Sequence, residues 1–379
     1  MDEDEDEFLN IIMDNGSMLT KAGFGEENEV RSVFTTLVKR PKNRSPFLGI
    51  NSKEAYIGDE VWLRRGTYIE KYPIQNKMIT DWDDIEKIWF HTFYNELRID
   101  PEDKTVILSE PSLNRKKIRE ICFEIMFETF SPQFFWMANS GFLALLFSEK
   151  KTGIVIEFGY SQMYIIPIFE GIVLDHAVVK SDFSGNDIND FMTQILNKKN
   201  YNMITSFERE IVRDIKEKLC FVSFDYENDK EISEKGGFNK KQYELPDGTD
   251  ILIDFERFTC PELIFQPNLI GFSQSLSVTG LIEKSISKCD IEIQPILLKN
   301  IILSGGSTKF PGFSERLKKE IINSFGKNFE VEITSPSNST YSVILGGFKL
   351  SKMSSFNNIK ISNQEFKEFG SSLIYHKIF

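Results

Sequence analysis

The sequence predicts an α/β protein built from two related halves. The first observation is a pair of similar hairpins, at residues 11–18 and 154–161. In each, an apolar strand leads into an acidic residue, a glycine-containing turn and a second strand. The second observation is that strands alternate with amphipathic helices after each hairpin, which is typical of mixed sheets flanked by helices. Two matched hairpins suggest a duplicated fold that closes on one ligand.

The turn of the first hairpin has the chemistry of an anion site. Asp14 ends the strand, and Asn15-Gly16-Ser17 follows it. Such a turn can direct several backbone N–H groups at a phosphate, and its carboxylate can hold a hydrated Mg²⁺. Asn-Gly is also the commonest signal of an ordinary hairpin turn. Both interpretations are open for one copy, whereas the matched pair favours nucleotide binding.

The composition limits the classes of function. The chain of 379 residues is long enough for two domains, and 41% hydrophobic with 27% charged residues is typical of a globular protein. A net charge of −12 argues against direct binding of nucleic acid or of an anionic membrane. We expect no membrane insertion, because the apolar runs are short. The four cysteines lack metal-ligand spacing and are expected to be mostly buried thiols.

Helical periodicity and turn signals place the main elements. The expected helices cover residues 80–97, 114–130, 184–196, 207–220 and 313–325. Thr80 is expected to cap the first of them. The polar stretch 228–241 is expected to be a surface loop, and Asp247-Gly248 a hairpin turn.

Several long runs in the chain resemble the sequences of actin and the actin-related proteins. The matching runs are WDD at 82–84, EKIW at 86–89, HTFYNELR at 91–98, MFETF at 126–130, EREIVRDIKEKLC at 208–220, YELPDG at 243–248, FQP at 265–267 and LSGG at 303–306. They extend over essentially the whole chain. The resemblance implies the actin-like ATPase fold, in which two duplicated α/β domains surround a cleft for ATP or ADP with Mg²⁺ or Ca²⁺.

The resemblance also implies that each domain is divided in two. Subdomain 1 would comprise residues 1–35, 73–147 and 342–379, and subdomain 2 residues 36–72 with an exposed loop at 42–53. Subdomain 3 would comprise residues 148–183 and 274–341, and subdomain 4 residues 184–273.

The same resemblance assigns binding positions residue by residue. It implies that Asp14 and Glu157 face a metal ion through water. The implied nucleotide-binding residues are Asn15, Gly16, Ser17, Lys21, Gly159, Gly185, Asp187, Arg213, Lys216, Glu217, Gly305, Gly306, Ser307 and Phe310. Met18 replaces a glycine of the family pattern and is expected to crowd the turn. Lys216 and Glu217 are also ordinary residues for an exposed helix, so that alternative stays open.

The second hairpin departs from the family pattern. Where the family has Asp-Ser-Gly-Asp-Gly, residues 157–161 are Glu-Phe-Gly-Tyr-Ser. This removes a hydroxyl expected to meet the terminal phosphate and replaces an acid by the phenol of Tyr160. Ser140 stands at the position of the family's water-positioning glutamine, and Tyr164 at that of its assisting histidine. Neighbouring Asn139 is expected on a helix, pointing about 100° away. Since a misplacement of about 1 Å can cost on the order of a hundredfold in rate, we expect a degraded hydrolytic apparatus without a clear catalytic residue.

Surfaces for partners also follow from the resemblance. The groove that receives partner helices is implied at Leu146, Gly171, Ile172, Leu350 and Met353, although ordinary helix packing is an equally good interpretation. The loop at 42–53 has the position that inserts into the neighbouring subunit of actin filaments. The acidic run at 2–7 is expected to be a solvated tail, or else a site for basic partners.

These expectations lead to three hypotheses about function. The first is a divergent actin-like subunit of an actin-related complex or specialised filament, with nucleotide as a structural ligand. Its partners would be other actin-like or complex subunits, actin and actin-binding proteins, in the cytoplasm and cytoskeleton, with the nucleus open as an alternative. The second is a conventional polymerising ATPase. The third, a small-molecule kinase, would need a catalytic base, and only Asp14 or Glu157 is available.

Overall fold

The computed structural model describes residues 9–42, 53–63, 68–236, 240–326 and 329–377, and the chain forms two compact units. Unit 1 comprises Met1–Lys150 and Tyr341–Phe379, and unit 2 comprises Lys151–Thr340. Unit 1 is therefore assembled from two separate stretches of sequence, whereas unit 2 is continuous. The finer division into four subdomains stays a prediction.

Unit 1 is built on a six-stranded mixed sheet with the order β18-β9-β8-β1-β2-β3. Its strands are β1 (Asn10–Asn15), β2 (Leu19–Phe24), β3 (Val30–Thr35), β8 (Thr105–Glu110), β9 (Phe134–Asn139) and β18 (Ile361–Ser362). Strands β1, β2 and β3 form antiparallel pairs, while β1, β8 and β9 run parallel. The consecutive residues Ile11, Ile12 and Met13 are all buried, as expected of a central strand covered on both faces.

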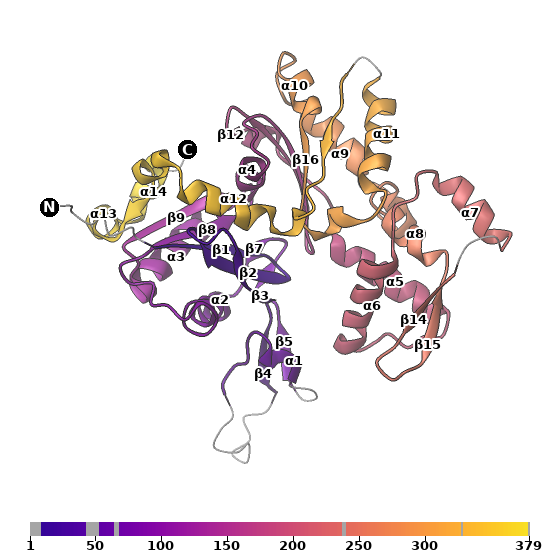
Figure 1. Cartoon of the computed structure of the whole chain (residues 1–379), viewed down its shortest axis with the longest axis horizontal. Helices are drawn as coiled ribbons and strands as arrows, with labels where there is room; N and C mark the ends of the chain where they lie inside the picture. Colours follow the sequence, from indigo (N-terminus) through magenta and orange to yellow (C-terminus); the bar gives the residue numbers. More distant parts are fainter. Residues whose placement is uncertain (1–8, 43–52, 64–67, 237–239, 327–328, 378–379) are drawn as a thin grey trace. The chain divides into compact units, whose positions relative to one another are not determined.

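Helices cover this sheet, and the last long one comes from the C-terminal stretch. The helices are α2 (Trp82–Phe90), continued by His91–Leu97, α3 (Lys116–Ile125), continued by Met126–Phe130, α4 (Ser140–Phe147), α12 (Ser342–Ser351), α13 (Asn363–Phe369) and α14 (Ile374–Lys377). Helix α12 packs on α4 and β1 (Figure 1). A Cβ atom at Gly346 would lie 1.9 Å from the carbonyl oxygen of Leu143, so only glycine permits this close approach.

Two small strand pairs and a short helix in the described part of unit 1 lie outside the main sheet. Strands β4 (Val38–Pro41) and β5 (Tyr68–Lys71) form one antiparallel pair, and β6 (Ile74–Gln75) and β7 (Met78–Ile79) form another. The short helix α1 spans Glu60–Leu63. Most of the loop predicted at 42–53 is outside the described residues.

Unit 2 repeats the arrangement of the first hairpin. Its six-stranded sheet has the order β12-β11-β10-β16-β17, with β13 also paired to β11. The strands are β10 (Gly153–Phe158), β11 (Met163–Phe169), β12 (Ile172–Val173), β13 (Val179–Lys180), β16 (Ile301–Ser304) and β17 (Ile333–Thr334). Strand β10 pairs antiparallel with β11 and parallel with β16, as β1 does with β2 and β8. The expected duplicated α/β architecture is confirmed.

Most of the helices of unit 2 contribute residues to one apolar cluster, and they agree with most of the predicted ranges. They are α5 (Gly185–Lys198), α6 (Ser206–Leu219), α7 (Tyr226–Glu234), α8 (Glu256–Glu262), α9 (Val278–Ile286), α10 (Gln294–Lys299) and α11 (Phe313–Phe325). The hairpin of β14 (Lys241–Glu244) and β15 (Asp250–Ile253) turns at Asp247-Gly248, as predicted.

Two local predictions were wrong. The stretch 228–241 is not simply a loop, because α7 occupies its first part, with the carboxylate of Asp225 accepting from the N–H of Asn228 at its start. The cap of α2 is Asp81 rather than Thr80, because the Asp81 carboxylate accepts from the N–H of Asp84. The Thr80 hydroxyl instead donates to the carbonyl oxygen of Pro73.

Two further expectations concern the whole chain. Among the described residues, no helix is long and apolar enough to cross a membrane. Cys122, Cys220, Cys260 and Cys289 are all buried and free, as expected of core thiols.

Candidate functional site

The first hairpin of unit 1 holds Asp14 in a buried network. Strands β1 and β2 pair Asp14 with Lys21, and the N–H of Gly16 closes the turn by donating to the carbonyl oxygen of Leu19 at 3.0 Å. The Lys21 ammonium donates to Asp14 Oδ2 at 2.7 Å. From the parallel neighbour β8, the Ser109 hydroxyl donates to Asp14 Oδ1 at 2.7 Å.

These contacts keep the carboxylate ionised. Burial acts to raise the pKa of Asp14, but the charge of Lys21 and the hydrogen bonds from Lys21 and Ser109 outweigh it. The pKa of Asp14 is therefore below its ordinary value, and a negative charge is fixed at the turn. A hard cation such as Mg²⁺ prefers such an oxygen.

The neighbouring Asn15 is the residue that points most directly to a ligand. Both polar atoms of its side chain, Nδ2 and Oδ1, are buried and make no hydrogen bond within the described chain. Buried polar atoms are normally paired, so an unpaired carboxamide is explained by a ligand or water that it binds. Ser17 and Met18 are also buried. The crowding expected from Met18 stays a prediction.

The second hairpin, in unit 2, is tied by its backbone to two other segments. The carbonyl oxygen of Gly159 accepts from the N–H of Gly185 at 3.2 Å and from the hydroxyl of Ser307 at 3.3 Å. The carbonyl oxygen of Tyr160 accepts from the N–H of Asn186 at 2.7 Å. The hairpin, the start of α5 and the turn after β16 thus meet, which brings together Gly159, Gly185 and Ser307. Their contact with a nucleotide stays a prediction.

The side chains of this hairpin point to opposite faces of its strand. Phe158 is fully buried in the core of unit 2, with its ring centroid 6.2 Å from that of Phe183. Glu157 is also buried, and lies opposite Tyr164 on β11. Phe158 therefore lacks the hydroxyl of the family pattern. Its ring lies on the opposite face of the strand from Glu157.

Tyr164 differs chemically from the histidine of the family pattern. Burial raises the pKa of Tyr164 to about 12, and the negative charge of Glu157 acts in the same direction. The phenol therefore keeps its proton at neutral pH. It can donate a hydrogen bond, but it cannot accept a proton as a neutral imidazole can.

The turn after β16 requires glycine at its first position. Gly305 has φ +93°, and a Cβ atom there would lie 2.4 Å from the carbonyl oxygen of Phe158. At Gly306 a Cβ atom would meet only Thr340 Oγ1, at 3.9 Å, so this side of the turn is open. Phe310, beyond the turn, is buried in the unit 2 core.

Helices α5 and α6 place the remaining predicted residues. Lys216 on α6 is only 5% exposed, and its ammonium donates to the carbonyl oxygen of Gly185 at 3.3 Å. Burial lowers the pKa of Lys216 to about 8. Arg213 pairs with Glu210 at 2.7 Å and lies 3.8 Å from Glu217, whose side chain is largely exposed. Lys216 therefore joins the cluster around Gly185, whereas Glu217 lies on the solvent side of α6.

Asp187 already has a structural role. Its carboxylate accepts from the N–H of Ser184 at 2.8 Å, and its own N–H lies 3.4 Å from the Ser184 hydroxyl, which completes a capping box at the start of α5. Asp187 therefore stabilises the start of α5, while its nucleotide contact stays a prediction.

Ser140 is buried at the first residue of α4. The expectation that neighbouring Asn139 is helical was wrong, because it is the last residue of β9 and the N-cap of α4. Its carboxamide oxygen accepts from the N–H of Phe142 at 3.1 Å, and its nitrogen donates to the Ser112 hydroxyl at 3.0 Å. Asn139 is therefore committed to the helix cap.

The residues predicted for a partner groove differ in exposure. In unit 1, Leu350 is buried and Leu146 partly buried, while Met353 is 40% exposed. In unit 2, Ile172 is 67% exposed and follows Gly171. The groove itself stays a prediction.

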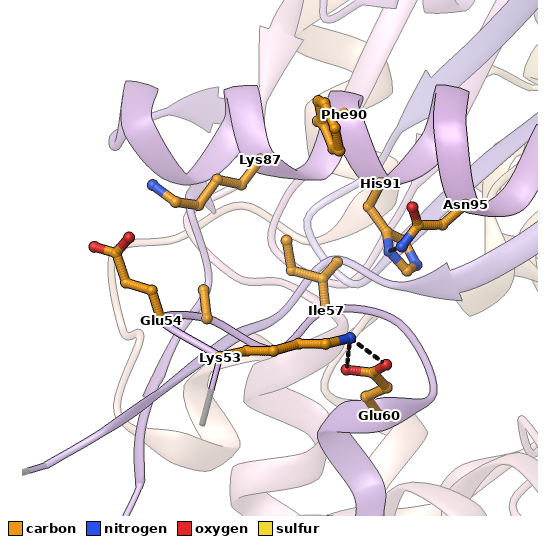
Figure 2. A pocket seen from close by; sticks show the side chains of 9 residues that line it. Lys53, Glu54, Ile57, Glu60, Lys87, Phe90, His91 and Asn95 are labelled. Carbon is orange, nitrogen blue, oxygen red and sulfur yellow. Dashed lines mark hydrogen bonds and ion pairs between the residues drawn. The ribbon is translucent and has the colours of Figure 1, made fainter. Parts of the chain in front are cut away.

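Unit 1 also has a hollow that none of the predicted site residues line (Figure 2). Its volume is about 270 Å³. The residues of α2 and its continuation, including His91, form one side, and Lys53, Ile57 and Glu60 form the other. The Lys53 ammonium contacts both Glu60 oxygens, at 2.6 and 2.8 Å. This hollow is distinct from the Asp14 turn.

In the described ranges, no group of three or more His, Cys, Asp and Glu side chains could hold a metal ion. The sequence reasoning missed Ser109, whose hydroxyl donates to Asp14, and Lys77, whose charge helps to lower the pKa of Asp14. The position of Ser109 near the end of a strand parallel to β1 was the sequence signal that could have placed it beside Asp14.

A comparison with protein families agrees with these observations. A family model described as Actin matches residues 5–379.

Proposed function

Because the chain belongs to the actin family, we propose that it is a divergent actin-like protein that binds ATP or ADP and hydrolyses it weakly or not at all. It acts as a subunit of an actin-related complex or specialised filament in the cytoplasmic cytoskeleton. Its partners are other actin-like subunits, actin or actin-binding proteins. The bound nucleotide is a structural ligand, which stabilises the folded state whether or not it is hydrolysed.

Ser140 is the observation that carries this proposal. Its side chain is too short to hold a water molecule where a glutamine would, and it is buried at the start of α4. The nearest carboxamide in sequence, Asn139, is committed to the helix cap and to Ser112. The protonated phenol of Tyr164 removes the second group expected to assist the water. Together these features support weak or lost hydrolysis.

Nucleotide binding is supported by the residues that remain. The unpaired carboxamide of Asn15 and the ammonium of Lys21 are suited to phosphate oxygens. In unit 2, Gly306 and Lys216 are candidates for the nucleoside part. A bound Mg²⁺ or Ca²⁺, with Asp14 and Glu157 as its carboxylates through water, would neutralise phosphate charge.

The alternative function is a conventional polymerising ATPase that forms filaments. The intact Asp14–Lys21 pair favours this alternative.

The test measures binding and turnover separately. Purified protein, denatured after removal of free nucleotide, is expected to release ATP or ADP in near-equimolar amount. The folded protein is expected to release almost no phosphate over hours. Sedimentation at the same protein concentrations shows whether it polymerises. Phosphate release that accelerates on polymerisation would contradict the proposal and favour the alternative.

Ser140→Gln is the variant that tests the cause of the weak or lost hydrolysis. We expect it to recover little activity, because Tyr164 and the second hairpin remain altered. Ser140→Ala, which changes the side chain without adding a carboxamide, is the matched control. A large recovery with glutamine alone would show that Ser140 is the main lesion.

A further inference from the structure

The hollow of unit 1 is shaped by contacts within the chain (Figure 2). His91 in its wall is held at both ring nitrogens, because Nδ1 accepts from the Asn95 carboxamide at 3.1 Å and Nε2 donates to Glu96 at 3.0 Å. The backbone of the opposite segment lies against the same ring, since a Cβ atom at Gly58 would lie 2.5 Å from His91 Nε2. The hollow is therefore formed before any ligand binds, as most binding pockets are.

The size of the hollow fits one large side chain better than a cofactor. Pockets for small-molecule ligands measure roughly 300–1,000 Å³. The volume here is about 270 Å³, and Ala55 and Ile57 make part of its lining apolar. Protein interfaces commonly seat an apolar anchor side chain in a pocket of the other protein. A leucine, methionine or phenylalanine of a protein partner is therefore a better match than a nucleotide or another cofactor.

The apolar surface continues outside the hollow. Phe90 lines the hollow from the end of α2 and is 54% exposed. The exposed ring of Tyr94 follows one helical turn later, with its centroid 4.5 Å from that of Phe90. Aromatic side chains are enriched in protein interfaces. Phe90 also stands between the runs 86–89 and 91–98 that resemble the actin sequences and belongs to neither, so the resemblance does not account for an exposed ring here.

Lys87 gives the rim of the hollow a positive charge that is not neutralised by an ion pair. It lies in the last turn of α2, and no hydrogen bond or ion pair joins its ammonium to another residue that the structure describes. The other lysine of the rim, Lys53, is committed to both oxygens of Glu60. Glu54 also lines the hollow but is not paired with Lys87. Charge complementarity therefore favours an acidic group on the partner at the Lys87 side.

We propose that this hollow is a docking site for a segment of a partner protein. The segment inserts one large apolar side chain against Ile57 and Phe90 and places an acidic side chain beside Lys87. The hollow is separate from the Asp14 turn, so this inference does not depend on nucleotide binding. The apolar anchor supplies most of the affinity, while the acidic residue sets the orientation of the segment and the rate of association.

The experiment selects binders for the full chain from a displayed library of random peptides. The enriched peptides are expected to share a large apolar residue close to an acidic one. Affinity is then measured by fluorescence anisotropy. Phe90→Ser is expected to weaken binding about tenfold through loss of the apolar contact. Phe369→Ser, which removes a ring of nearly equal exposure (55%) from α13, is the matched control and should change nothing.

A charge exchange tests the role of Lys87. Lys87→Glu is expected to weaken binding, with a smaller loss at high salt. Replacing the acidic residue of the peptide by lysine should restore affinity for this variant alone. All three side chains are at least partly exposed, so the melting temperatures of the variants should equal that of the natural chain.

Two results would overturn the inference. The first is a library without the apolar–acidic pattern, or with peptides that bind Phe90→Ser and Lys87→Glu as tightly as the natural chain. The second is self-association in sedimentation that Phe90→Ser abolishes and Phe369→Ser does not, because the hollow would then receive a second copy of this chain.

Discussion

At the scale of single residues, the buried Asp14 and the partly buried His91 are both ionisable groups of unit 1, but their neighbours fix different charge states. Asp14 keeps its negative charge because Lys21 and Ser109 donate hydrogen bonds to it. Burial lowers the pKa of His91, and the nearby Glu96 carboxylate only partly opposes this effect. The imidazole lies 3.0 Å from Glu96, which also accepts from Ser32 on β3. The Glu96 carboxylate therefore links the helical continuation to β3, with a neutral imidazole beside it at neutral pH.

This state of His91 predicts a pH dependence of stability. The pKa of His91 is below 6.5 in the folded chain, so the unfolded chain binds the proton more readily. The free energy of unfolding is therefore expected to fall as the pH decreases below about 6.5. In His91→Gln, the difference in melting temperature between pH 7.5 and 5.5 should be smaller than in the natural chain. His176→Gln, at an exposed position, is the control; an equal change in both variants would contradict the prediction.

Single residues also show which parts of the Asp14 site could not be predicted from the sequence. Asp14, Asn15 and Lys21 could be placed at the turn because strand, acid and turn residues are adjacent in sequence. Ser109 contacts Asp14 only through the fold, from β8, and the charge of Lys77 acts on Asp14 from the turn between β6 and β7. A two-residue turn between two-residue strands has no hydrophobic periodicity. No sequence pattern therefore indicated that Lys77 points inward.

At the scale of elements, the second hairpin depends on the turn after β16. Gly305 lies against the carbonyl oxygen of Phe158, and its N–H donates to the carbonyl oxygen of Ser339 at 2.9 Å. This contact fixes the distance between β10 and the Gly306-Ser307 turn. The geometry of the predicted nucleoside side thus depends on the absence of one Cβ atom.

Gly305→Ala is expected to destabilise the protein by about 2 kcal/mol or more, because a left-handed backbone and a clash with Phe158 act together. Gly326→Ala is the matched control. Gly326 has φ +87° but nothing within 4 Å of a Cβ atom, so only the backbone cost of roughly 1 kcal/mol is expected. Denaturant unfolding measures the loss in the free energy of unfolding for both variants. Equal losses would show that the contact with Phe158 is unimportant.

The elements themselves were largely predictable. The helix expected from 184 is α5, and the charged run from 207 follows α6 closely. Helix α7 was missed because its sequence is almost entirely polar, with Tyr226 its only buried residue. The error at Thr80 arose because Thr80 and Asp81 are both good caps, and only the tertiary contact of Thr80 with Pro73 decides between them.

At the scale of the whole molecule, the two units differ in how the chain builds them. Unit 2 has its own apolar cluster, formed by residues between 154 and 331. Unit 1 needs α12 from the C-terminal stretch to cover β1 and α4. The sequence predicted both halves through the repeated hairpin, but no local pattern showed how much the first half depends on α12.

This difference predicts the behaviour of fragments. Residues 151–340 alone are expected to unfold cooperatively on heating, because their core is complete. Residues 1–150 alone are expected to lack a cooperative transition, because the surface covered by Gly346 and Gly347 is exposed. Joining 1–150 to 341–379 through a flexible linker should restore the transition. A fragment 1–150 that unfolds as cooperatively as the joined one would contradict this account.

The close contact between Gly346 and Leu143 also has a consequence for synthesis on the ribosome. The partner helix α4 is translated before the 190 residues of unit 2, and α12 only after them. At roughly 5–20 residues per second, unit 1 waits on the order of 10–40 s for the helix that covers it. During that interval the nascent chain exposes the apolar surface around Ile12, while unit 2 can already fold. The order of translation therefore makes the N-terminal half the slower one to become protected from aggregation.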